Sequence, residues 1–126
     1  MRFETLTGEK QIAFLQRLHK TINRKIFKGE LAPLQNTPKD INPDFITRLG
    51  KLDTQKEQAK ALVRAMLHEM VHQYCEKNGI DDRNHSEQWQ RAAADHWLHS
   101  VYSQGQPVEE WINTPAVNIA NSLRLK

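Results

Sequence analysis

The chain has 126 residues, of which 38% are hydrophobic and 26% are charged, and its formal net charge is +3 at pH 7. This composition is typical of one soluble globular domain and excludes a disordered chain. No apolar run approaches the ~18 residues needed to cross a membrane. The single cysteine, Cys75, excludes an internal disulfide and a Cys-x-x-Cys zinc ribbon, and we interpret it as a packing residue. Met1 to Gly8 lack the apolar core of a signal peptide, so we expect a cytoplasmic protein.

Positive charge is concentrated in the first half of the chain. Residues 1–64 have a net charge of +6, whereas residues 65–126 have a net charge of −3. Such clustering is compatible with a DNA-binding surface, and equally with the solvated faces of ordinary helices. The basic residues of this half include Lys10, Arg17, Lys20, Arg24, Lys25, Lys28, Arg48, Lys51, Lys56, Lys60 and Arg64.

Residues 8–28 are predicted to form an amphipathic helix. Thr7 is suited to cap its start and Gly29 to end it. His19 stands among lysines, and we expect it at the surface. The apolar side of the helix is marked, at spacings of three and four residues, by Leu15, Leu18, Ile22 and Ile26.

The stretch from Glu30 to Asp53 is predicted to be mostly loop. Three prolines interrupt it, and several Asn and Asp residues supply turn chemistry. Only Leu31–Leu34 and Phe45–Leu49 have the apolar character of strands. Because both segments are short, any sheet that they form is small.

The main helix is predicted from Thr54 to Lys77, since no Gly or Pro falls between Asp53 and Asn78 and Gly79 is suited to end it. A polar loop follows, and then a third helix that carries Trp89. A final helix is expected from Pro115 to about Leu123.

His68 and His72 lie four residues apart in the most apolar part of the main helix. Side chains at this spacing share one face, so both imidazoles can reach one metal ion. Zinc is well suited to imidazole nitrogen, and Glu69 can take a proton from water that the metal activates. His-Glu-x-x-His on a helix is typical of zinc peptidases. The plainer interpretation, buried polar residues that bond to their neighbours, is weaker because one ion satisfies both rings at once.

A third ligand is needed, and His85 is the best candidate. It follows His72 by 13 residues, beyond a glycine that ends the helix and a loop long enough to turn back. His96 and His99 are the alternatives. His96 could instead orient a ligand or be a core histidine with satisfied hydrogen bonds.

The order of these motifs resembles the SprT-like, or Spartan-type, zinc metalloprotease domain over roughly residues 10–100. The segments that carry the resemblance are Ile26–Pro33, Arg48–Lys51, His68–Tyr74 and Asp81–Trp89. The resemblance implies that His68, His72 and His85 bind zinc and that Glu69 is the general base. Well-known members of this family cleave proteins crosslinked to DNA.

The resemblance predicts an α+β fold that is mostly helical, a small zincin-like domain with a short, reduced β-sheet. We expect one domain over residues 1–126, with a helical extension over about residues 101–126. The chain departs from the family in Ser86, where glycine usually follows the third histidine. It also has a shortened strand before the main helix and no downstream zinc ribbon.

The expected function is a zinc-dependent metalloendopeptidase that binds one Zn²⁺ and acts on a protein or peptide, with DNA as a partner through the basic half. A peptidase specific for one cellular regulator is an alternative. A non-catalytic DNA-binding or adaptor module with structural zinc is another. The oxyanion-stabilising group stays open among Tyr102, His96 and Arg64, whereas Tyr74, two residues after His72 on the helix, is expected to point away from the site.

Overall fold

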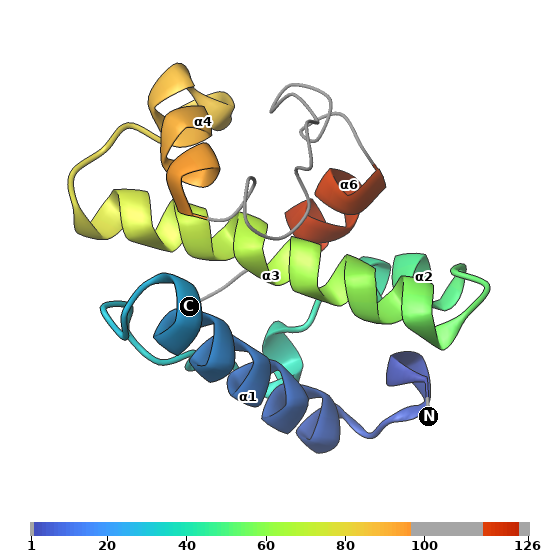
Figure 1. The fold of residues 1–126 in the computed structure, drawn as a ribbon. Coiled ribbons are helices and arrows are strands. Elements are labelled where there is room, and N and C mark those ends of the chain that lie inside the picture. Colours follow the sequence, from blue (N-terminus) through green and yellow to red (C-terminus); the bar gives the residue numbers. More distant parts are fainter. Residues whose placement is uncertain (1, 97–114, 124–126) are drawn as a thin grey trace.

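The computed structural model describes residues 2–96 and 115–123, which are mostly helical and contain no strand (Figure 1). The predicted helical character is therefore confirmed, whereas the short sheet is not found among the described residues. The elements, with η for 3-10 helices, are η1 (Phe3–Thr5), α1 (Gly8–Ile26), η2 (Pro38–Asp40), α2 (Pro43–Gly50), α3 (Gln55–Lys77), η3 (Arg83–His85), α4 (Glu87–Ala93) and α6 (Pro115–Ser122).

The 23-residue helix α3 is the axis on which the other helices pack, with α1 on one side and α4 and α6 on the other (Figure 1). It begins where the Thr54 hydroxyl accepts a hydrogen bond from the backbone N–H of Glu57 (3.0 Å). Beyond its end, Gly79 has a φ of +68°, a left-handed conformation that glycine adopts without steric cost. This turn lets the N–H of Ile80 donate to the carbonyl of Cys75 (2.8 Å). The predicted bounds of the main helix are confirmed to within a residue.

Helix α1 follows the prediction at its start, where Thr7 accepts a hydrogen bond from the N–H of Lys10 (3.3 Å). It ends at Ile26, two residues earlier than predicted. The cause is Gly29, whose φ of +76° lets its N–H donate to the carbonyl of Asn23 (2.9 Å). The chain therefore leaves the helix before residue 28.

The prediction that His19 lies at the surface is wrong. Its side chain is 1% exposed, and its Nε2 lies 2.9 Å from Oε1 of Gln73 on α3. His19 follows Leu15 by four residues and precedes Ile22 by three, so it belongs to the buried stripe. The amide of Gln73 donates to the carbonyl of Ala32 (2.9 Å), which turns its oxygen toward His19. His19 is therefore the donor in this pair, and burial lowers its pKa although the Gln73 hydrogen bond opposes that shift.

The prediction of a strand at Phe45–Leu49 is also wrong, because these residues lie within helix α2. The side chain of Asn42 accepts a hydrogen bond from the N–H of Asp44 (2.9 Å), and Pro43 occupies the first turn. Phe45 and Leu49, four residues apart, point to one side and are fully buried. Phe45 and Leu49, which gave the predicted strand its apolar character, thus form the buried face of a short capped helix.

The segment Leu31–Leu34, the other expected strand, has no regular secondary structure and pairs with no strand among the described residues. The Asn23 side chain instead satisfies both backbone groups of Leu31, donating to its carbonyl (2.8 Å) and accepting from its N–H (3.1 Å). The Asn23 side chain of α1 therefore supplies the hydrogen bonds that a neighbouring strand would give to Leu31.

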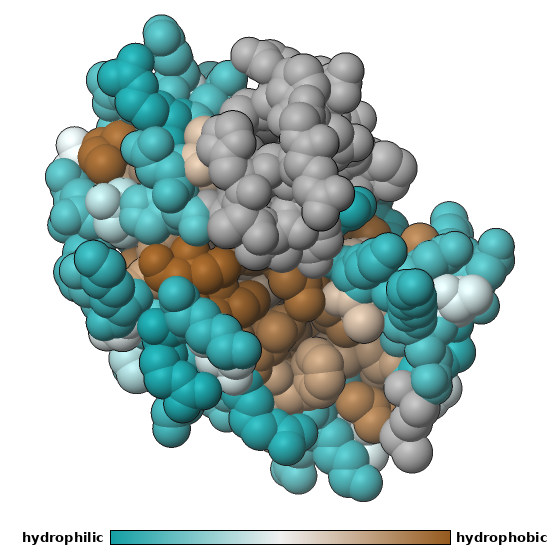
Figure 2. All heavy atoms as spheres, viewed as in Figure 1, coloured by the Kyte–Doolittle hydropathy of each residue, from teal (hydrophilic) through white to brown (hydrophobic). Residues whose placement is uncertain are grey.

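Buried apolar side chains from all the longer helices form one cluster, which includes Leu15, Phe45, Met66 and Trp89. Figure 2 shows apolar side chains gathered between α1 and α3, with hydrophilic side chains around them. In the described part of the chain, no helix is both long and apolar enough to cross a membrane.

Cys75 is fully buried on α3, as expected for a packing residue. Burial, with the negative charges of Asp82 and Glu76, raises the pKa of its thiol to about 11. We predict that the folded protein does not react with a thiol-specific disulfide reagent at pH 8, and that it reacts once unfolded in urea. Colour development in the reagent assay measures both rates, and a rapid reaction of the folded protein would contradict this prediction.

Candidate metal centre

Helix α3 brings His68 and His72 together one turn apart. Their ring centroids are 5.0 Å apart, His68 is fully buried, and His72 is partly exposed. Their four-residue spacing in a long helix without interruptions makes this arrangement a consequence of the local sequence. The predicted pair is thus placed as expected, with one ring at the base of the site and the other at its opening.

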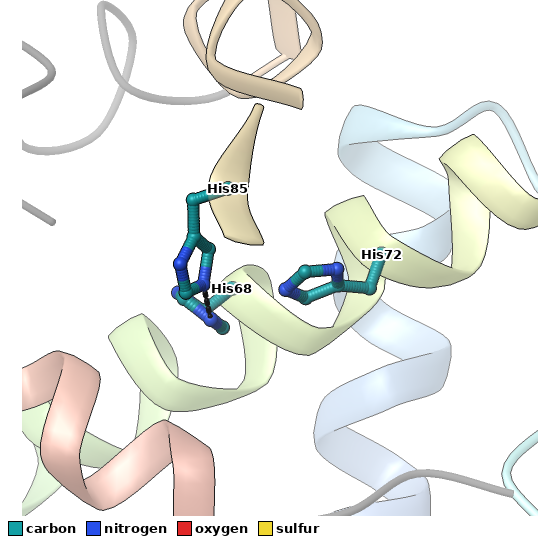
Figure 3. A group of neighbouring side chains, drawn as sticks. All are labelled: His68, His72 and His85. Atoms are coloured by element: carbon teal, nitrogen blue, oxygen red, sulfur yellow. Dashed lines mark hydrogen bonds between the residues drawn. The ribbon is translucent and has the colours of Figure 1, made fainter. Parts of the chain in front are cut away.

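His85 enters the same site from η3, the short turn that precedes α4. Its Nε2 lies 2.9 Å from Nε2 of His68, and its ring centroid lies 5.2 Å from that of His72. Figure 3 shows this ring reaching from the η3 turn toward the two rings on α3. One nitrogen from each of the three histidines lies within 4.8 Å of the others. The structure therefore brings together all three residues predicted as ligands.

This donor set fits a metal ion with a preference for imidazole. Two nitrogens that bind one tetrahedral zinc at 2.0–2.1 Å are roughly 3.3 Å apart, so small ring rotations are enough to reach that geometry. Burial, with repulsion from His72 and His85, lowers the pKa of His68 to about 2. Burial and His72 also lower the pKa of His85, although Asp82 opposes that shift. Both rings are therefore neutral at neutral pH, which is the form that binds metals.

Asp82 orients His72, a role that the sequence reasoning missed. Its Oδ2 lies 2.8 Å from Nδ1 of His72, and both side chains are mostly buried. A proton on Nδ1 leaves Nε2 with a lone pair for the metal, as in the carboxylate–histidine pairs of many zinc sites. An acidic residue between the second and third ligands was a signal for this role. The adjacent Asp81 and Asp82 could not be told apart by spacing alone.

The backbone around His85 has an uncommon conformation. Asn84 and His85 have φ values of +54° and +52°, in the left-handed region that residues other than glycine rarely adopt. The carbonyl of His85 accepts a hydrogen bond from the amide of Gln90 (3.0 Å), which holds the turn to α4. Ser86, where the SprT-like family has glycine, accepts a hydrogen bond from the N–H of Trp89 (3.2 Å) and so caps α4. Its own φ of −52° makes no demand for glycine.

The remaining candidates have different surroundings. His96 stacks on Phe27, with centroids 4.9 Å apart, and donates from Nδ1 to the carbonyl of Ala92 (2.8 Å). Tyr74 packs against the same His96 ring (4.2 Å). His96 is therefore a packed histidine outside the cluster of three. Glu69 is partly buried beside His68 on α3. His99 and Tyr102 lie outside the described residues.

Comparison with known proteins assigns the chain to no family, since no protein-family model, curated protein or solved structure matches it. What the structure defines is a cluster of three histidines that could hold a metal ion. The chemistry of this cluster carries the functional argument.

We predict that Asp82→Ala weakens zinc binding by about 10–100-fold, because His72 loses the partner that fixes its tautomer and orientation. Asp82→Asn, which keeps the shape and one hydrogen-bond acceptor, is expected to lose less. Competition with a chromophoric chelator measures both dissociation constants. Equal zinc affinity of wild type and Asp82→Ala would remove Asp82 from the site.

Proposed function

We propose that the protein is a zinc-dependent metalloendopeptidase of the SprT-like kind. The observation that carries this proposal is that His85, from a separate loop, meets the His68 and His72 pair of a His-Glu-x-x-His helix. Three imidazole ligands leave a coordination position open, as catalytic zinc sites do, whereas structural zinc sites usually have four protein ligands.

The residues of the site divide the chemistry between them. Bound zinc lowers the pKa of water and polarises a carbonyl group. His68, His72 and His85 would hold the ion, and the hydrogen bond from His72 to Asp82 keeps one ligand in the correct tautomer. The buried His68 is held neutral by its surroundings and so adds no positive charge to the site.

Glu69 is the general base in this proposal. It directly follows His68, so its carboxylate leaves α3 about 100° around the helix from the ligand. It accepts a proton from the attacking water and passes it to the nitrogen of the leaving amine. If Glu69 only offset the positive charge of a bound metal ion, it would not transfer this proton.

The zincin-like fold is also part of the proposal. It is supported by the long, buried helix that carries two ligands and by the loop that supplies the third immediately afterwards. Where strands were expected, the described residues contain helix α2 and the loop Leu31–Leu34, and the side-chain amides of Asn23 and Gln73 join this loop to α1 and α3. The cytoplasmic location stays a prediction from sequence.

We predict that the purified wild type contains close to one zinc per chain and cleaves an unfolded, fluorescently labelled protein such as casein. Glu69→Gln should keep the zinc and lose at least about 100-fold in cleavage rate, because proton transfer is removed while the ligands stay. Metal analysis by mass spectrometry and release of labelled peptide are the two measurements.

The control is Glu76→Gln, the same change of residue type at an exposed position of the same helix, which should alter neither zinc content nor cleavage. A wild type without zinc would defeat the proposal. A zinc-loaded wild type whose behaviour is unchanged by Glu69→Gln would favour the structural-zinc module. Cleavage of one defined protein without DNA would favour the regulator-specific peptidase.

DNA is proposed as a partner because of the exposed face of α1. Lys10, Arg17 and Arg24 recur every seven residues, and Lys20 lies between the last two, so these four exposed side chains share one face. They extend over about 21 Å of helix. None of the ion pairs found among the described residues involves an α1 side chain. The positive charge of this face is thus available to phosphates.

We predict that the triple variant Arg17→Glu, Lys20→Glu, Arg24→Glu binds duplex DNA more weakly than wild type. The slope of log affinity against log salt should fall by about 0.9 for each phosphate contact that is lost. Fluorescence anisotropy of a labelled duplex at several salt concentrations measures both quantities.

The matched control is Lys39→Glu, Lys51→Glu, Lys56→Glu, which changes the net charge equally at exposed positions outside the α1 helix, in η2, after α2 and in α3. It should retain more of the affinity. If both triple variants lose the same affinity and slope, net charge rather than the α1 face accounts for binding.

A further inference from the structure

Trp89 contacts all three histidines of the metal centre. Its ring centroid lies 5.0 Å from that of His68, 5.2 Å from that of His72 and 4.7 Å from that of His85. These distances lie within the range of direct aromatic packing. The indole is fully buried, so its position is fixed by close packing with its neighbours.

The position of Trp89 in the chain makes this contact informative. Two of the histidines belong to α3, whereas His85 belongs to the η3 turn. Trp89 lies in the first turn of α4, which begins directly after η3 and its cap Ser86. The backbone N–H of Trp89 donates a hydrogen bond to the hydroxyl of Ser86 (3.2 Å). One rigid side chain therefore touches both halves of the site, and it is tied to the loop half through its own backbone.

The hydrogen-bond contacts around the three rings each involve a single ring or backbone group of a pair. Nε2 of His85 lies 2.9 Å from Nε2 of His68, Asp82 bonds to His72, and Gln90 bonds to the backbone carbonyl of His85. A histidine ring can rotate about its two side-chain bonds unless packing restricts it. The indole packs against each of the three rings and restricts their rotation together.

We propose that Trp89 is a positioning residue that sets the relative orientation of the three imidazoles and thereby the affinity of the metal site. This inference rests on the metal site of the proposed function, and not on peptide cleavage. The large, flat indole holds the His85 ring in register with the rings on α3 before the ion binds. The rings then lose little rotational freedom when a metal ion binds, so the entropic cost of binding is smaller and the affinity is higher. The indole also keeps that side of the ligands dry, which strengthens their interaction with a cation.

The test compares Trp89→Leu and Trp89→Phe with wild type, using two readouts that need no enzymatic activity. The first is the zinc dissociation constant from chelator competition. The second is the visible spectrum of the Co²⁺-substituted protein, which reports ligand geometry. Trp89→Leu should weaken zinc binding by about 10–100-fold, as loss of supporting residues around metal ligands does, and should change the cobalt spectrum. Trp89→Phe keeps an aromatic ring there and should recover part of both.

The matched control is Phe45→Leu. Phe45 is also fully buried and packs edge-on against Phe3 (6.0 Å), and it belongs to α2, which carries none of the three histidines. Its replacement should lower the free energy of unfolding without changing zinc affinity in the folded protein or the cobalt spectrum. If Phe45→Leu and Trp89→Leu change both readouts equally, Trp89 acts through general stability and the inference is overturned.

The remaining outcomes are also decisive. Wild-type affinity and spectrum in Trp89→Leu overturn the inference while the metal site stands. If Trp89→Leu does not fold, Trp89→Phe decides, since unchanged affinity overturns the inference and reduced affinity supports it. A wild type that binds neither zinc nor cobalt defeats the metal site itself, and this result differs from a failure of the Trp89 inference alone.

Discussion

The packing of the His85 loop against α3 is the constraint on which the site depends. Without it, α3 carries two neighbouring imidazoles, one fully buried and one partly exposed, and the fully buried His68 would be costly to bury. With it, three ring nitrogens converge, and one cation can satisfy all of them. The capped turn at Ser86, the carboxylate of Asp82 and the indole of Trp89 all act on this one contact.

The rest of the fold supports α3 with helices and with a few amides that bond to backbone groups. Gln58 accepts a hydrogen bond from the N–H of Phe3 (2.6 Å) and donates to the carbonyl of Leu49 (3.1 Å), which joins η1 and α2 to α3. Asn23 and Gln73 bond in the same way to the backbone of the loop after α1. Polar groups of this kind must be satisfied when they are buried, and Gln58 and Gln73 here bond to backbone groups 55 and 41 residues away in the sequence. A β-sheet would join such segments by a ladder of backbone hydrogen bonds, whereas here individual side-chain amides bond to the backbone.

Most of the helical framework could be predicted from the sequence, because its signals are local. The caps Thr7 and Thr54 and the glycines Gly29 and Gly79 mark helix ends by chemistry that acts over a few residues. The strand prediction at Phe45–Leu49 failed because a short apolar run fits both periods, and the cap at Asn42 decided in favour of a helix.

The three candidate metal ligands could be predicted because their residue types and spacing are demanding. His85 was the hardest of them to place from the sequence, since a loop can return in many ways, and the structure brings it to the pair on α3. Asp82 and Trp89 could not be predicted, because their roles depend on how that loop and α4 fold back. His19 was misjudged because neighbours in sequence were given more weight than its position on the buried stripe of the helix.

The left-handed backbone at His85 limits which residues could replace this candidate ligand during evolution or engineering. A β-branched or bulky residue would meet a steric cost of about 1–2 kcal/mol there, whereas Asp, Asn and His tolerate this conformation best. Among these, Asp is itself a metal ligand, with a preference for harder ions. The backbone conformation of this turn therefore permits replacement of His85 by Asp and disfavours most other replacements. In this way the backbone limits which metal ions a variant of the proposed site could prefer.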